Sequence, residues 1–457
     1  MERIKTWIKD NKADSLFIAC ALLFGALFGF AVIAYDDAYN MPLIGATIKE
    51  EIRYNLNSYH SWTSRILINT VWSIILEHVY YLYMIYMAIS MYVLCKALYH
   101  IIPGEKDYKK AVFTVMVAMF FPFHLMTSAG WIATTGTYFG PQAFGIMALL
   151  PMGKIAKKEA LSIKEVLWFS LCLLYGANFE QMCVALVFLY GVFCVWMLME
   201  KNIRFETFLF LGLGVASLIF ILTCPGNWGR SGEEAELFPT YGMLGFVDKL
   251  ELATSLTLKW IYLDGTLLTL FLLGLIAVVV WKKYSHPGYR LAATIPFGVS
   301  LLLGPLRDVT EYLFPKVGML TEDIEYYGAI NVEHRGVGIG LLQLFVCLSL
   351  SLLVLVSLIL INDTLRDLVA DVSLVLVGVG TGTMMGFSPT IYASEGRTFS
   401  TLTLCVMILL MHIYEKNRDT FALAFKKVNI LYVEYAVILF SYLNLATLIM
   451  TQFYSQA

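Results

Sequence analysis

The sequence predicts an all-α protein, a bundle of transmembrane helices that crosses a bilayer many times. Two observations carry this prediction. The chain of 457 residues is 59% hydrophobic and only 14% charged, whereas charged residues make up about 25% of a typical soluble domain. Its apolar residues also gather in runs of the length that a membrane-spanning helix needs, about 20 residues. We therefore treat residues 1–457 as a single transmembrane domain with little soluble mass.

Apolar runs along the chain predict about thirteen spanning helices. The first run is long enough to span and lacks a small-residue cleavage site, so it is interpreted as an anchor and not as a signal peptide. Several later runs are short, and polar residues interrupt the stretch between 166 and 199. The predicted spans are 15–35, 79–101, 111–128, 138–152, 166–178, 182–199, 206–223, 264–281, 291–305, 338–361, 368–387, 398–414 and 428–448.

Basic residues predict the side of the membrane on which each loop lies. If the N-terminus is cytoplasmic, 21 Lys and Arg residues fall in inside segments and ten in outside segments. Cytoplasmic loops normally carry such an excess of Lys and Arg. The sequence therefore predicts a cytoplasmic N-terminus and three long outside loops, at 36–78, 224–263 and 306–337.

Charge and cysteine content argue against several functional classes. The net charge of −2 gives no reason to expect a nucleic-acid partner. The eight cysteines lie almost all in apolar runs and show no Cys-x-x-Cys or Cys/His spacing, so neither a disulfide framework nor a zinc site is indicated. Function usually lies on loops that a rigid scaffold holds, and the long outside loops are where chemistry is expected.

The first outside loop begins with a carboxylate pair, Asp36 and Asp37, directly after the first predicted span. Adjacent carboxylates at a membrane edge can act as a general base or bind a metal ion, although polar residues also simply end a span. Residues 43–60 are predicted to form a short amphipathic helix, and residues 66–77 a second apolar segment. Such helices lie in the membrane interface and would cover a site that faces lipid.

Three later outside segments place an arginine next to glycine. An arginine fork matches phosphate oxygens, and glycine lets a backbone approach a ligand closely. Each segment alone is equally consistent with an ordinary solvated turn. The residues are Asn227 and Arg230 in the fourth outside loop, Glu333, His334 and Arg335 in the fifth, and Glu395 and Arg397 in the sixth.

Aromatic and polar residues of other outside turns complete the candidate set. Trp62 precedes Arg65 by three residues, and Trp131 and Tyr138 lie in the second outside turn. Interfacial Trp and Tyr are more often membrane anchors than ligand contacts.

The third outside turn holds Asn178 and Glu180 between two apolar runs. A carboxylate in so tight a turn lies near hydrocarbon, where ionisable groups are costly and usually functional. His412 and Glu434 also fall within predicted spans, but nearer the cytoplasmic side, so they are not assigned to the outer site.

Taken together, these features resemble the GT-C glycosyltransferases, and in particular the bacterial polytopic proteins related to GtrII-type glucosyltransferases. The likeness rests on the acidic pair after the first span, the interface helices of the first outside loop, and Trp62 before Arg65. The elements Thr-Gly-Thr-Tyr, Asn-Phe-Glu-Gln, Pro-Gly-Asn-Trp-Gly-Arg and Ser-Pro follow in the order typical of that group. The resemblance extends over most of the chain, and no single motif in it is diagnostic.

The resemblance implies a bacterial plasma-membrane enzyme that takes a sugar from a polyprenyl-phosphate donor at the outer face. The acceptor would be a cell-surface glycan or a lipid-linked saccharide, with Asp36 or Asp37 as the base and Asp37 slightly favoured. Such enzymes differ in their use of a divalent metal, so the resemblance leaves metal dependence open. Residues implied to bind the donor phosphate are Arg65, Arg230, His334, Arg335 and Arg397. Residues implied to contact sugar or acceptor are Trp62, Trp131, Tyr138, Asn178, Glu180, Asn227, Glu333 and Glu395.

Two other functional classes stay open. A transporter or flippase for a lipid-linked saccharide would hold its polar groups near mid-membrane on broken helices, whereas most charged candidates here lie at the outer rim. A glycan polymerase or ligase would share the site and much of the mechanism, so the sequence does not separate it from a single-sugar transferase.

Overall fold

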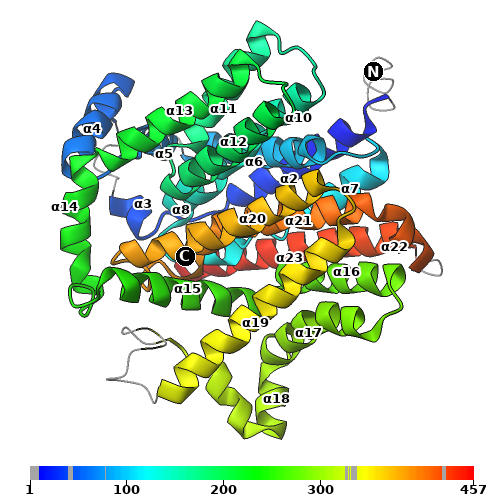
Figure 1. Cartoon of the computed structure of the whole chain (residues 1–457). Coiled ribbons are helices and arrows are strands. Elements are labelled where there is room, and N and C mark those ends of the chain that lie inside the picture. The colour runs from blue at the N-terminus through cyan, green and yellow to red at the C-terminus, as the bar shows by residue number, and fades with distance from the viewer. Residues whose placement is uncertain are drawn as a thin grey trace. The chain divides into compact units, whose positions relative to one another are not determined.

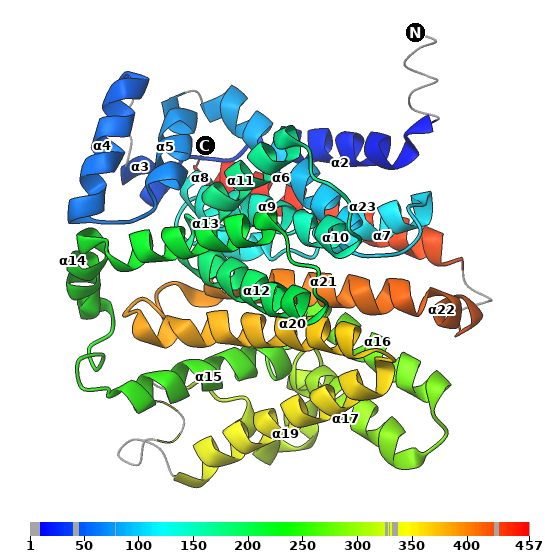
Figure 2. The same ribbon diagram turned by 45° about the horizontal axis from the view of Figure 1, so that its top comes forward.

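The computed structural model of the chain is all-α (Figures 1 and 2). It describes residues 10–39, 45–77, 79–324, 328, 330, 337–424 and 429–456, and no strand occurs among them. The chain divides into two compact units, the first formed by Met1–Arg230 with Val428–Ala457 and the second by Ser231–Lys427. The all-α prediction is therefore confirmed for the described residues.

The first unit contains the candidate carboxylate pair and most of the other predicted site residues. Its last element, α23, comes from the C-terminal end of the chain and packs against α7 and α2. Its elements are α2 (Lys12–Phe28), α3 (Asp36–Tyr39), α4 (Ile48–Ser61), α5 (Ile66–Glu77), α6 (Val79–Ile101), α7 (Tyr108–Ala118), η2 (Phe123–Thr127), α8 (Trp131–Thr134), η3 (Thr135–Phe139), α9 (Gly140–Met147), α10 (Leu150–Ala156), α11 (Ile163–Gly176), α12 (Glu180–Met199), α13 (Phe205–Leu222), the first part of α14 (Pro225–Glu234) and α23 (Ile430–Gln456).

An aromatic core fixes the end of α2 that leads into the carboxylate pair. The rings of Phe24 and Phe28 lie 5.0 Å and 6.3 Å from that of Phe123, and Phe28 meets the indole of Trp131 at 5.2 Å. Large buried aromatic rings contribute much of the hydrophobic stabilisation of a core. This cluster therefore holds η2 and α8 against α2, which positions the loop between α2 and α3.

The second unit is built around α16, which packs against α17, α19 and α21, while α20 packs against α15 and α21. Its elements are η4 (Ala235–Leu237), α15 (Phe246–Tyr262), α16 (Leu267–Lys283), α17 (Pro287–Leu303), α18 (Arg307–Leu313), η5 (Pro315–Leu320), α19 (Val337–Ile361), α20 (Leu365–Thr383), η6 (Met384–Phe387), η7 (Glu395–Phe399), α21 (Ser400–Lys416) and α22 (Arg418–Ala424).

Helix length and hydropathy make the chain a multi-pass membrane protein. Among the described residues, seven helices are long and apolar enough to cross a membrane, or up to nine if each of two bent helix pairs counts as one span. The seven are Tyr81–Ile101, Glu180–Met199, Phe205–Leu222, Gly340–Ile361, Leu365–Phe387, Gly396–Lys416 and Ile430–Tyr454. The bent pairs are α15 with α16, at 70°, and α17 with α18, at 86°.

The count of seven to nine is smaller than the predicted thirteen, because several apolar runs form helices too short for a full span. The run 15–35 holds the 17-residue α2, and 166–178 holds the 14-residue α11. The run 111–128 holds the 11-residue α7, which ends just before Pro122, and 138–152 is broken between α9 and α10. Local breaks therefore divide apolar stretches that composition alone joins into spans.

Both helices predicted for the first loop are present. Thr47 caps α4 through a capping box, in which its hydroxyl accepts the Glu50 N–H at 3.4 Å and its own N–H donates to the Glu50 carboxylate at 2.7 Å. The 12-residue α5 is about 18 Å long, which is too short to cross a bilayer. Residues 43 and 44, where the predicted amphipathic helix begins, lie outside the described residues.

Candidate functional site

The two carboxylates at the start of α3 have different environments. Asp36 is exposed to solvent, whereas Asp37 is fully buried. The Asp37 carboxylate accepts the backbone N–H of Ala133 at 2.7 Å through Oδ1 and that of Ala34 at 3.4 Å through Oδ2. The first N–H groups of a helix have no partner within the helix. Asp37 therefore caps α8 and ties the loop after α2 to it.

The backbone around this carboxylate is constrained. Gly130 has φ +94°, and a Cβ there would lie 2.4 Å from the Ala34 oxygen and 2.5 Å from Cγ of Asp37, so only glycine fits. Tyr35 has φ +50°, which is uncommon for a residue with a side chain. Strained backbone of this kind concentrates at functional sites.

Burial also changes the acidity of Asp37. Desolvation raises the pKa of the Asp37 carboxyl from 3.8 to about 6, although the backbone N–H groups of Ala133 and Ala34 offset part of the rise. Burial disfavours the charged form of a carboxyl group, while hydrogen bonds to that form favour it. The carboxyl group therefore gains and loses its proton close to neutral pH.

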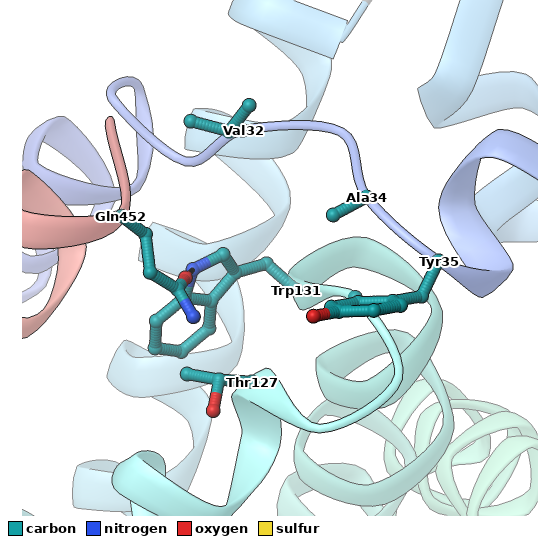
Figure 3. A pocket seen from close by; sticks show the side chains of 7 residues that line it. Val32, Ala34, Tyr35, Thr127, Trp131 and Gln452 are labelled. Atoms are coloured by element: carbon teal, nitrogen blue, oxygen red, sulfur yellow. Dashed lines mark hydrogen bonds between the residues drawn. The ribbon is translucent and has the colours of Figure 1, made fainter. Parts of the chain in front are cut away.

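A cavity of about 130 Å³ lies next to the carboxylate pair (Figure 3). Two of its lining residues, Ala34 and Gly130, are the backbone neighbours of Asp37. The indole N–H of Trp131 donates to Oε1 of Gln452 at 2.6 Å, so α23 forms part of the wall. The cavity offers aromatic surface, a hydroxyl and an amide to a polar ligand. Its lining residues are Val32, Ala34, Tyr35, Thr127, Gly130, Trp131 and Gln452.

A second cluster of the first unit is centred on Arg65 and Glu180. Nε of Arg65 lies 3.0 Å and 2.9 Å from the two Glu180 oxygens, and Nη2 lies 2.8 Å from Oε2. The guanidinium carbon is 5.6 Å from the ring centroid of Phe179, which itself contacts Tyr138 at 5.2 Å. Arg230 also acts electrostatically on Glu180. The charge of Arg65 is thus balanced by Glu180, and Arg230 brings a second cation to the cluster.

Two asparagines hold the Trp62–Arg65 segment against this cluster. Nδ2 of Asn178 donates to the Ser64 carbonyl at 3.0 Å, and its Oδ1 accepts the N–H of Ile68 at 3.1 Å. Asn227 accepts the Ser64 N–H at 3.2 Å and donates to the Ser64 hydroxyl at 3.1 Å. A Cβ on Gly226 would lie 2.3 Å from the Trp62 nitrogen. The turns before α12 and at the start of α14 therefore fasten both sides of the segment.

The first unit thus brings together most of the residues that the sequence singles out. The second cluster contains Trp62, Arg65, Asn178, Glu180, Asn227 and Arg230, and Tyr138 on η3 contacts its Phe179. Trp131 lines the cavity, and the carboxylate pair adjoins it, because Asp36 follows the lining residue Tyr35 and Asp37 contacts Ala34. Arg397 lies half-buried in η7 of the second unit. The Glu395 side chain and the whole of Glu333, His334 and Arg335 lie outside the described residues.

Comparisons of the chain with protein-family models, with curated proteins and with solved structures find no match.

Some residues of the site carried little signal in the sequence. Gln452 follows the last predicted span and is a single polar residue near the end of the chain. Ser64 and Tyr35 adjoin residues that were singled out, but each makes its contribution through contacts with other segments or through backbone conformation. A polar side chain past the end of an apolar run is too common to be selected without knowledge of its tertiary neighbours.

The described part of the chain contains no group of three or more His, Cys, Asp or Glu side chains arranged to hold a metal ion. Metal dependence therefore stays open.

Proposed function

We propose that the chain is a glycosyltransferase of the GT-C type in a bacterial plasma membrane. It would transfer a sugar from a polyprenyl-phosphate donor to a cell-surface glycan or a lipid-linked acceptor at the outer face. The observation that carries the proposal is the placement of an exposed and a buried carboxylate next to a polar, aromatic cavity, at the end of a helix in a multi-pass membrane protein.

Asp36 is the proposed base and Asp37 the residue that positions it. A base must contact the acceptor, and only Asp36 of the pair is exposed. Its carboxylate would accept the proton of the acceptor hydroxyl as the acceptor oxygen bonds to the anomeric carbon and the bond from that carbon to the donor phosphate breaks. A positioned base typically accelerates such a step by roughly 10²–10⁴-fold. Polyprenyl phosphate leaves with the bonding electron pair.

Arg230 is the proposed cation for the departing phosphate. Preorganised cations stabilise charge that develops in a transition state. Arg65 already forms a close ion pair with Glu180, whereas Arg230 approaches the same carboxylate from α14. Arg65 and Glu180 would then serve mainly to hold the Trp62–Arg65 segment in place.

The cavity next to Asp37 is the proposed subsite for part of the acceptor. Ligand sites combine apolar or aromatic walls with a few placed polar groups, and here Trp131 and Tyr35 supply the rings while Thr127 and Gln452 supply hydrogen-bonding groups. Its volume of about 130 Å³ holds a small portion of a saccharide, with the rest outside. A polymerase or ligase would use the same site with a longer acceptor.

A transporter of lipid-linked saccharides is the second candidate, because of features of the second unit. Asp371 is buried within α20, and its carboxylate lies 2.6 Å from Nδ1 of His412 and 2.7 Å from Nδ2 of Asn362. Ionisable groups inside a membrane bundle commonly mark ion or substrate pathways. The two bent helix pairs of this unit are also compatible with the discontinuous helices of transporters.

The decisive assay uses the purified protein in liposomes with a radiolabelled polyprenyl-phosphate sugar. We expect transfer of the label to an added glycan acceptor, no reaction with a nucleotide sugar alone, and a rate roughly 10²–10⁴-fold lower for Asp36→Asn. The matched control is Asp308→Asn, which removes another exposed carboxylate from a predicted outside loop. Passage of the unchanged labelled lipid across the bilayer without transfer would favour the transporter instead.

A further inference from the structure

The helix α4 packs with its polar side inward. Glu51, Asn55 and Ser58 are buried, and Nδ2 of Asn55 lies 3.4 Å from the Ser73 hydroxyl on α5. A stripe next to this buried side exposes Ile48, Ile52 and Leu56, at 60%, 42% and 52% of their surface. A helix on the surface of a soluble protein turns its apolar residues toward the core. The exposed stripe of α4 therefore requires an apolar environment outside the protein.

Basic side chains border this apolar stripe on one side. Lys49 and Arg53 each follow an isoleucine of the stripe by one position, and both are exposed. Successive helical residues are rotated by about 100°, so the two cations form a row next to the isoleucines. His60 continues the row toward the end of α4. An apolar stripe with a basic edge matches a layer of acyl chains beneath anionic headgroups.

Contacts within the first unit place α4 at the level where a spanning helix ends. The Tyr59 hydroxyl lies 3.2 Å from the Phe220 carbonyl and 3.1 Å from the Thr223 hydroxyl, and its ring stacks on Phe220 at 4.6 Å. These residues form the last turn of the candidate span α13. Figures 1 and 2 show α4 next to this end of α13, and in Figure 2 α4 stands at a steep angle to α13.

Two exposed tryptophans mark the same level. Trp62 follows α4 directly, and Trp228 lies on α14 just beyond the end of α13. Tryptophan is enriched where a membrane protein passes through the headgroup region. The end of α4 thus lies at the depth of the lipid headgroups.

We propose that α4 is an anionic-lipid binding helix that lies in the membrane surface. Ile48, Ile52 and Leu56 insert among the acyl chains, and Lys49 and Arg53 pair with phospholipid phosphates of the bilayer. Each basic residue near an anionic membrane surface strengthens binding by about 1 kcal/mol, which is roughly fivefold in affinity. The inference is independent of the proposed transferase activity.

Paired cysteine substitutions test the position of the stripe. Leu56→Cys and Asn57→Cys are adjacent and both exposed, but only position 56 belongs to the stripe. With a bimane label in nanodiscs, we expect position 56 to be quenched by doxyl-labelled phospholipid and position 57 by aqueous iodide. The protein without an added cysteine measures labelling of its native cysteines. Equal quenching of the two positions by both reagents would overturn the proposal.

Charge substitutions test the choice of lipid. Bimane at position 56 should be quenched more strongly by doxyl-phosphatidylglycerol than by doxyl-phosphatidylcholine. Lys49→Gln and Arg53→Gln should each lower the apparent preference for the anionic lipid by roughly fivefold, whereas Lys49→Arg, and Lys316→Gln at an exposed position of the second unit, should keep it. If the unsubstituted protein shows no preference, or if neither lipid quenches position 56, the anionic-lipid assignment is wrong.

Discussion

Asp36 and Asp37 show how adjacent residues of one chemical type acquire different properties. Successive positions on a helix point about 100° apart, so α3 directs one carboxylate to solvent and the other to the backbone of α8. The buried group gains two backbone hydrogen bonds and a pKa of about 6. Under the proposed function, the exposed Asp36 is the base and the buried Asp37 holds it in position.

Substitution of Asp37 should change how thermal stability depends on pH. The pKa of Asp37 is raised in the folded protein, from 3.8 to about 6, so its contribution to stability is full below pH 3.8 and is lost as the pH rises through about 6. The difference between the two pKa values corresponds to roughly 3 kcal/mol. Asp37→Asn removes this titration, so the melting temperature of the variant should fall less than that of the wild type between pH 4 and pH 7.

Asp36→Asn is the matched control for that measurement in detergent, because the exposed neighbour should keep most of the wild-type pH dependence. A flat profile for Asp36→Asn, together with a wild-type profile for Asp37→Asn, would show that Asp37 is not the group whose titration changes the stability.

Arg65 and Arg230 should respond differently to truncation. Arg65→Ala leaves Glu180 without its close partner, so we expect a lower melting temperature. Arg230→Ala should mainly raise KM for the polyprenyl-phosphate donor, in a salt-dependent manner. A hydrogen bond to a charged group contributes about 1.5–3 kcal/mol, which is roughly ten- to hundredfold in affinity. Donor titrations at two salt concentrations and melting curves of each variant test these roles. If Arg230→Ala lowered only the melting temperature and left KM unchanged, Arg230 would not be the phosphate-binding cation.

At the scale of elements, the loop between α4 and α5 is held by side chains from the ends of two other helical hairpins. Asn178 and Asn227 form hydrogen bonds with the backbone carbonyl and N–H of Ser64, which in an isolated turn would bond to water. A buried backbone group without a partner costs about 1–3 kcal/mol. The ends of α11, α12, α13 and α14 are therefore coupled to the segment that carries Trp62 and Arg65.

Removal of one asparagine should loosen this segment. Asn178→Ala leaves the Ser64 carbonyl and the Ile68 N–H without their side-chain partner, so we expect a loss of about 1–3 kcal/mol and faster tryptic cleavage after Arg65. Asn57→Ala, an exposed asparagine of α4, is the control and should behave like the wild type. Equal cleavage rates for the two variants would show that Asn178 does not hold the loop.

For the whole molecule, the question is which apolar helices cross the membrane. Only 22% of the apolar window of α13 is buried in the protein, so most of this helix faces lipid. The shorter helices α7, α9, α10 and α11 lie between longer candidate spans in the chain. The side of the membrane on which the connecting loops lie determines how many of them cross.

Cysteine labelling of intact cells tests the predicted topology. Gly232→Cys, in the predicted fourth outside loop, should react with a membrane-impermeant maleimide, whereas Lys157→Cys, between α10 and α11, should react only after lysis; both positions are exposed. The physical reason is the excess of basic residues in the loops assigned to the cytoplasm. The reverse labelling pattern would place the Asp36 site on the opposite face and end the proposal of an outer active site.

Several features of this protein follow from the sequence by itself. Apolar runs and their flanking residues predicted the all-α class, the multi-pass character and two helices in the first loop, because these depend on local hydrophobicity and on neighbours along the helix. The first of the two was predicted at 43–60 and is observed at Ile48–Ser61. The carboxylate pair at the end of α2 and the motif residues of the second cluster were also selected from the sequence, although their chemical roles stay predictions.

Only the tertiary structure decided which of these residues meet. Arg65 and Glu180 are 115 residues apart, and Trp131 and Gln452 are 321 apart, so no local pattern links them. Asp37 is buried, and Asp36 is not, because Gly130 lets the start of α8 approach the Asp37 carboxylate closely. The span count fell because polar and proline breaks end helices inside runs whose average composition is apolar. Local hydrophobicity selects helices, while packing between distant segments sets burial, partners and charge.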